Sequence, residues 1–236
     1  LTARALNVDL LVHYGHSCLI PIDPTDTDNS LKVLYVFVDI KIDALHFLET
    51  IESNFDKANN VLGLASTIQF VSTLQAVANE LRAHGYAIEL PQSKPLSPGE
   101  LLGCTAPKFH DADVLVYLGD GRFHLEAAMI ANPKLPAYRY DPYDKKFTKE
   151  YYGHEEMRRV RFKSVTETKS ARKFGLIMGT LGRQGSEKVV SRMRSRLHAM
   201  DRRAITILLS EIYPAKLGLF GDGPEAFVQV ACPRLS

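Results

Sequence analysis

The sequence of 236 residues contains no apolar run of the roughly 18 residues that a membrane-spanning helix needs. The first residues, Leu1 to Leu6, also lack the pattern of a signal peptide, so we expect a cytoplasmic protein without membrane association. The sequence has only three cysteines, which is an odd number. They are Cys18, Cys104 and Cys232, separated by 86 and 128 residues. These spacings fit neither a disulfide framework nor a local zinc motif, which leaves reduced thiols or metal ligands.

Two common catalytic motifs are also missing from the sequence. It contains no Gly-x-Ser-x-Gly, so the nucleophile elbow of a serine hydrolase is not indicated. Its glycine-rich turns lack the Gly-Lys-Ser/Thr ending of a phosphate-binding P-loop. Neither of these two catalytic classes is therefore supported by a motif.

The net charge is only +2, but the charge is unevenly distributed. Residues 141–203 contain 17 Lys and Arg against 8 Asp and Glu, whereas the remainder contains 12 against 19. Basic helices often simply face water, which is one interpretation of this region. The other is a docking face for an acidic macromolecule or an anionic ligand. Direct readout of a nucleic acid is not expected.

The chain is organised around an apolar run from Asp9 that stops at Gly15 and is followed by Cys18. A short run rich in Leu and Val predicts a strand buried on both faces, with the cysteine in the loop at its carboxyl end. Similar segments recur at 113–122 and 227–234. Ligands of open α/β sheets bind at this edge, so the repeat predicts three similar units with functional loops there.

Strands and helices alternate along the chain, which predicts an α/β fold with parallel sheets and flanking helices. We expect a partial first domain at 1–40, a second domain at 41–143, and a connector plus third domain at 144–236. Residues 145–173 are basic and helical in tendency and form the expected connector. Both ends of the chain are expected to lie inside domains. Two helices are indicated by apolar stripes, at Ile42, Leu45, Phe47, Leu48 and Ile51, and at Val71, Leu74, Val77, Ala78 and Leu81.

Two glycine-rich turns are candidates for binding an anionic group. Gly119, Asp120 and Gly121 lie between an expected strand and a helix that begins near Arg122, where backbone N–H groups can hold an anion. The second turn, around Arg183, follows the expected strand 174–179. Either arginine could pair with a carboxylate through a bidentate fork. The alternative for both arginines is simple solvation at the surface.

Each cysteine by itself is most simply a buried, inert thiol. Because Cys18 and Cys232 both follow expected strands and Cys104 lies in a Gly/Pro-rich loop, the three can instead converge from three units. Three converging thiolates would form a soft-metal site for zinc, copper(I) or an iron–sulfur cluster. A cluster held by three cysteines leaves one iron free for substrate.

Five segments resemble the subunit 1 family of the eukaryotic diphthamide synthases, which are 2-(3-amino-3-carboxypropyl)histidine synthases. The segments are Val12–Cys18, Gly119–Glu126, Tyr140–Tyr143, Gly179–Gly185 and Val230–Ser236. The resemblance implies three similar α/β domains arranged around a central 4Fe-4S cluster, with Cys18, Cys104 and Cys232 as its ligands. It also implies S-adenosylmethionine as substrate.

The implied reaction is a radical transfer of the 3-amino-3-carboxypropyl group from S-adenosylmethionine to a histidine of translation elongation factor 2. This is the first step of diphthamide biosynthesis. The resemblance further implies a heterodimer with a homologous second subunit and a small iron-containing electron donor. Our candidates for holding the methionine portion are Gly119, Asp120, Gly121, Arg122, Arg183 and Gln184.

Two alternatives to a catalytic transferase subunit remain open from the sequence. The first is a non-catalytic scaffold subunit of the same heterodimer, whose own cluster is absent or auxiliary. The second, which does not use the resemblance, is an α/β nucleotide-binding module built on the two glycine-rich turns.

Overall fold

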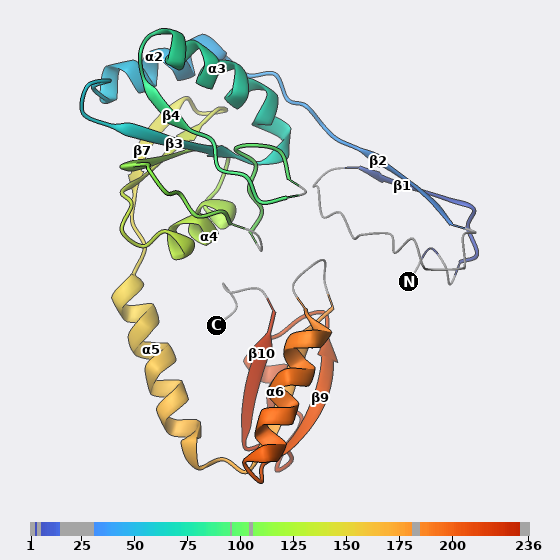
Figure 1. Cartoon of the computed structure of the whole chain (residues 1–236). Coiled ribbons are helices and arrows are strands. Elements are labelled where there is room, and N and C mark those ends of the chain that lie inside the picture. Colours follow the sequence, from blue (N-terminus) through green and yellow to red (C-terminus); the bar gives the residue numbers. More distant parts are fainter. Residues whose placement is uncertain are drawn as a thin grey trace. The chain divides into compact units, whose positions relative to one another are not determined.

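The computed structural model describes residue 3 and residues 6–14, 31–94, 96–103, 106–180 and 185–231. The chain divides into two compact units, Leu1–Tyr152 and Gly153–Ser236. The elements pair into three separate sheets, of two, five and three strands (Figure 1). None of the described helices combines the length and apolarity that a membrane span requires.

The first sheet consists of β1 (Leu10–Tyr14) and β2 (Lys32–Val36), which pair in parallel. The predicted strand is present, but the prediction that it is buried on both faces is wrong. Leu10 is 51% exposed and Tyr14 is 69% exposed. Burial on both faces needs layers above and below the sheet. The described residues contribute two strands to this sheet, and the side chains of these strands are largely exposed.

The central sheet has five strands in the order β4-β3-β5-β6-β7. Its first four strands are mutually parallel, as expected for strands joined by crossover helices. Their bounds are Val61–Ser66 (β3), Ala87–Glu89 (β4), Val114–Leu118 (β5) and Ala137–Asp141 (β6).

The fifth strand of this sheet corrects the sequence prediction, which assigned residues from Lys145 onward to a connector. Lys146–Glu150 forms β7 and pairs antiparallel with β6. The Phe147 ring stacks on the Tyr138 ring at a centroid distance of 5.3 Å. This aromatic pair and the hydrogen bonds to β6 stabilise a strand here. The high charge of the segment had suggested a solvated helix instead.

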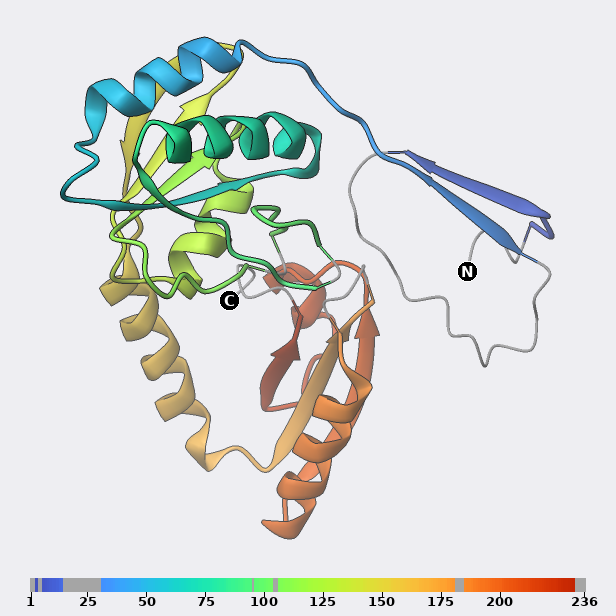
Figure 2. The same cartoon turned by 45° about the horizontal axis from the view of Figure 1, so that its top comes forward.

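Helices cover both faces of the central sheet (Figure 2). Helices α2 (Ala44–Asn54) and α3 (Val71–Ala83), the latter preceded by the short η1 (Ile68–Phe70), share one core with β3 and β5. Helix α4 (Phe123–Ala131) packs on the opposite face. The predicted stripe of α3 is confirmed, since all five of its apolar residues are buried. The helix is followed by Gly85, whose φ of 93° suits a glycine after a helix end.

The second unit begins with α5 (His154–Glu167) and η2 (Thr168–Ser170), and no residue of either is buried. Its sheet has the order β10-β8-β9, and all pairings are parallel. The strands are Lys173–Gly179 (β8), Arg203–Leu209 (β9) and Ala226–Val230 (β10). Helix α6 (Glu187–Ala199) packs against β8 and β9, and the short α7 (Pro214–Gly218) precedes β10.

Candidate functional site

The three cysteines, together with Arg183 and Gln184, lie outside the described residues. The strands that lead to two of the cysteines are described. Strand β1 ends at Tyr14, four residues before Cys18, and β10 ends at Val230, two residues before Cys232. Each of these cysteines therefore follows the carboxyl end of a parallel strand, the edge at which α/β proteins bind ligands.

The segment before Cys104 is fixed to the carboxyl end of β3. The Ser66 N–H donates to the Gly99 carbonyl at 2.8 Å, and the Leu101 N–H donates to the Ser66 carbonyl at 2.9 Å. A Cβ on Gly103 would overlap the ring of Phe123, the first residue of α4. Gly103, directly before Cys104, therefore lies against the amino end of α4.

The segment after Cys104 is held by hydrogen bonds with the side chain of Asn132. This residue lies at the end of α4 and is 7% exposed. Its Oδ1 accepts from the Phe109 N–H at 2.9 Å. Its Nδ2 donates to the Pro107 carbonyl at 3.0 Å and to the Ala128 carbonyl at 2.9 Å. The sequence analysis did not identify this role of Asn132.

Glu89, at the end of β4, holds the next part of the same loop. Its carboxylate accepts hydrogen bonds from the backbone N–H groups of three consecutive residues at 2.8 to 3.1 Å. The donors are His110, Asp111 and Ala112. Two side chains from different elements thus hold the loop that follows Cys104.

Replacing Asn132 with aspartate tests this fastening. A carboxylate cannot donate to the Pro107 and Ala128 carbonyls, so both acceptors would face a negative charge. We expect a loss of about 2 kcal/mol and a fall in the unfolding temperature of about 4–8 °C, measured by calorimetry. The control is Asn54→Asp on the exposed part of α2, whose Nδ2 donates to a single carbonyl. Equal effects of the two variants would contradict the proposed role of Asn132.

The turn at Gly119, Asp120 and Gly121 lies at the carboxyl end of β5 and leads directly into α4. The Gly119 N–H donates to the Tyr140 carbonyl at 3.1 Å, which ties the turn to β6. Gly121 has a φ of 63°, a conformation that favours glycine. The structure thus brings this predicted turn next to Gly103, since both adjoin the start of α4.

Arg122 already has acceptors within its own unit. Its Nη2 donates to the Tyr151 carbonyl at 2.7 Å. Its Nη1 lies 3.4 Å from the Glu150 carboxylate, and its Nε lies 3.6 Å from that of Glu126. The guanidinium therefore links α4 to β7, and a ligand carboxylate would have to compete with these contacts.

Three buried hydroxyls lie at the carboxyl ends of β3 and β5. Within the described part of the chain, the hydroxyls of Ser66, Thr67 and Tyr117 have no hydrogen-bond partner of good geometry, although Thr67 lies close enough to Tyr117 to act on its hydroxyl. A Cβ on Gly119 would lie 2.5 Å from the Tyr117 hydroxyl, so glycine is needed for the tyrosine to lie over the turn. Polar residues directly after an apolar run, Ser66 and Thr67, were the available signal for this cluster, which the sequence analysis did not identify.

The Tyr117 hydroxyl stays protonated in this environment. Burial raises the pKa of Tyr117 well above its usual value, and the negative charge of Asp120 adds to the increase. The Thr67 hydroxyl acts in the opposite direction. Tyr117 can therefore present an O–H donor beside the Gly119 turn.

The second glycine-rich turn is described only at its ends. A Cβ on Gly185 would overlap the carbonyl of Gly179, the last residue of β8. This close approach places the end of the turn directly on the carboxyl end of the strand. No group of three or more His, Cys, Asp or Glu side chains is placed to hold a metal within the described ranges.

Comparisons with known proteins agree with these observations. The family model described as "Putative diphthamide synthesis protein" matches residues 1–236. The chain is 58% identical to 2-(3-amino-3-carboxypropyl)histidine synthase subunit 1 of Nematostella vectensis over 235 residues, covering 100% of this chain and 49% of that protein. The human protein of the same name is 56% identical over 236 residues, covering 100% of this chain and 53% of the relative. The chain thus spans about half the length of these curated relatives.

Solved structures show the same fold. The crystal structure of Dph2 from Pyrococcus horikoshii has a TM-score of 0.75 and 25% identity, covering 99% of this chain and 67% of that chain. A second structure of that protein, with a 4Fe-4S cluster, has a TM-score of 0.76 and 24% identity, covering 99% and 66%. These matches confirm the predicted α/β class with mainly parallel sheets, and the family match confirms the resemblance found in the motifs. The chain therefore belongs to the diphthamide synthesis protein family.

Proposed function

We propose that this chain is part of a catalytic iron–sulfur subunit that transfers the 3-amino-3-carboxypropyl group from S-adenosylmethionine to a histidine of translation elongation factor 2. The observation that carries the proposal is the position of the cysteine-bearing segments. Two cysteines follow the carboxyl ends of parallel strands, and the third follows a segment bonded to the carboxyl end of β3. The names of the relatives support the same chemistry.

Cys18, Cys104 and Cys232 are the proposed ligands of a 4Fe-4S cluster. Thiolates are the ligands that iron–sulfur clusters take in proteins, and three of them leave one iron open. The solved Dph2 structure with a 4Fe-4S cluster supports the same cofactor for this chain. When bound and reduced, the cluster supplies an electron to the sulfonium of S-adenosylmethionine. The sequence prediction placed three domains around this site, at 1–40, 41–143 and 144–236. Because β7 belongs to the central sheet, we propose that the second domain extends through Glu150.

The residues of this chain would bind and orient the substrate. We propose Gly119, Asp120, Gly121 and Arg122, with Arg183 and Gln184, as the groups that hold the methionine portion. The amino end of α4 favours an anion such as the substrate carboxylate. The protonated Tyr117 hydroxyl next to the turn can donate to a polar group of the same ligand.

The proposed assembly is a cytoplasmic heterodimer with a homologous second subunit, and "subunit 1" in the relatives' names supports a complex. A small iron-containing protein would supply electrons. The basic region 141–203 would border the surface that meets the elongation factor.

A scaffold subunit without its own catalytic cluster is the second candidate function. The presence of all three cysteines favours the catalytic candidate, because a scaffold has no need of them. The two candidates differ in what a cysteine substitution should do.

The experiment follows two labels in S-adenosylmethionine under anaerobic conditions, with the complete heterodimer and elongation factor 2. We expect a label in the methionyl carboxyl carbon to enter the elongation factor and a label in the methyl group to leave with methylthioadenosine. The Cys232→Ser variant should transfer neither label. Transfer of the methyl label would overturn the proposed reaction, and full activity of Cys232→Ser would favour the scaffold.

A further inference from the structure

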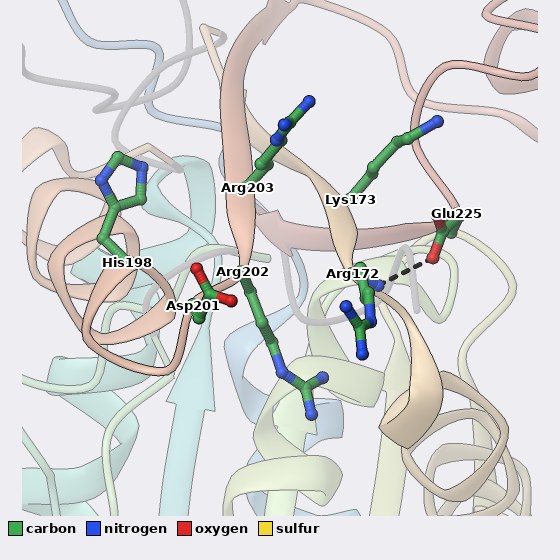
Figure 3. Close-up of a pocket in the computed structure, with 7 residues that line it drawn as sticks. All are labelled: Arg172, Lys173, His198, Asp201, Arg202, Arg203 and Glu225. Atoms are coloured by element: carbon green, nitrogen blue, oxygen red, sulfur yellow. Dashed lines mark hydrogen bonds between the residues drawn. The ribbon is translucent and has the colours of Figure 1, made fainter.

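A basic pocket lies at the amino-terminal edge of the third sheet, the edge opposite to the carboxyl ends of β8 and β10. It has a volume of about 450 Å³ and is lined by Arg172, Lys173, His198, Asp201, Arg202, Arg203 and Glu225 (Figure 3). Strands β8 and β9 begin there with Lys173 and Arg203. Each strand has 7 residues, so roughly 20 Å separates the pocket from the carboxyl edge. Within the second unit, the pocket therefore lies at the other end of the sheet from the Gly185 turn.

Cations outnumber anions in this pocket. Four arginine and lysine side chains face two carboxylates, and no ion pair within the described residues involves any of the four cations. The Glu225 carboxylate accepts a hydrogen bond from the Arg172 backbone N–H at 2.7 Å. It therefore holds the backbone at the edge of the sheet rather than pairing with an arginine side chain.

Arg202 differs from Lys173 and Arg203 in how firmly its side chain is held. Arg202 is fixed, because its guanidinium donates to the Ala171 and Lys169 carbonyls and lies 5.7 Å from the centre of the Phe174 ring. Lys173 and Arg203 are register partners on neighbouring parallel strands and point to the same side of the sheet. Like charges at such positions repel each other, and a bound anion would relieve the repulsion.

A second, apolar pocket of about 210 Å³ shares Lys173 and Arg203 with the first. The rest of its lining is Phe174, Ile205, Gly223 and Pro224. Ile205 is 53% exposed, so an apolar group can reach it from solvent. The two shared cations therefore stand between a charged pocket and an apolar one.

We propose that this edge docks an acidic peptide segment of a partner protein that carries an apolar side chain. The carboxylates of such a segment would meet Lys173, Arg203 and Arg172, and its apolar side chain would fill the pocket beside Ile205. A single phosphate is disfavoured, because Arg172 and Arg203 point to opposite sides of the sheet edge. RNA is disfavoured because Phe174 is 7% exposed and offers no open ring for a base to stack on.

The test measures binding by fluorescence anisotropy, using the full chain and a labelled peptide of Asp and Glu with one central Leu. Replacing both Lys173 and Arg203 with glutamine should weaken binding about tenfold. The matched control replaces Lys188 and Arg194, exposed cations of α6 outside the pocket, and should bind as the wild type does. Circular dichroism checks that both variants fold.

Three further results would overturn the proposal. They are equal weakening by the control variant, tighter binding of a poly-uridine oligonucleotide than of the peptide, and no binding of the peptide at low salt. A peptide with Ser in place of Leu should bind several-fold more weakly, and equal affinity would exclude the apolar pocket. Because the readout needs no cluster and no S-adenosylmethionine, this inference and the proposed function can fail independently.

Discussion

Replacing Cys104 with serine is expected to reduce the iron content of the anaerobically reconstituted protein from about four atoms per chain to near zero. A serine hydroxyl is a harder and far less acidic ligand than a thiol, so it holds an iron–sulfur site much more weakly. The sequence also has no fourth cysteine that could supply a substitute thiolate. The measurements are iron and sulfide analysis, visible absorption and the paramagnetic spectrum of the reduced protein.

The same result is expected for Cys18→Ser and Cys232→Ser, and the three variants serve as each other's controls because the sequence has no fourth cysteine. Thermal unfolding of each variant without iron separates loss of a ligand from loss of the fold. Full iron in any one variant would remove that cysteine from the ligand set. Wild-type protein that takes up zinc or no metal after reconstitution would favour the scaffold function.

Replacing Gly185 with alanine is expected to destabilise the protein more than the same replacement at any other described glycine of the second unit. The new Cβ would overlap the carbonyl of Gly179, and a backbone atom cannot move aside as the end of a side chain can. We expect a loss of about 3 kcal/mol in stability, together with loss of S-adenosylmethionine binding. Calorimetry of unfolding and equilibrium dialysis with labelled S-adenosylmethionine measure the two effects.

Gly218→Ala is the control for this substitution. No atom lies within 4 Å of the position that its Cβ would take, so stability and binding should stay close to those of the wild type. If Gly185→Ala binds S-adenosylmethionine normally, the turn that includes Arg183 and Gln184 does not hold the substrate. If both variants lose stability equally, the close approach to Gly179 is not the cause.

Local sequence patterns predicted the elements whose structure is determined by residues close in sequence. The stripe of α3 was clear because its apolar residues recur at helical spacing and Gly85 follows the helix. Strand β7 was not predicted, since its stability comes from Phe147 stacking on Tyr138 in another strand. The exposure of β1 was also missed, because an apolar run indicates a strand but does not show which layers cover it.

The glycine-rich turns of the candidate site could be predicted from the sequence, whereas the side chains that hold its loops in place could not. The Gly119 turn could be recognised from its glycines and from its place between a strand and a helix. The roles of Asn132 and Glu89 could not be predicted, since their hydrogen bonds join residues 21 to 25 positions apart. The cysteines lie outside the described residues, so their convergence stays a prediction.

The way the loop after Cys104 is held sets limits on how its sequence can change. Asn132 and Glu89 bind the backbone N–H groups of residues 109–112 and leave most of their side chains unconstrained. Phe109 and Ala112 are the exceptions, because both side chains pack against Gly63. Surface substitutions at 110 and 111 should be tolerated, whereas proline at any of these four positions would remove a hydrogen-bond donor. The fold of this loop therefore depends on its backbone more than on its exposed side chains.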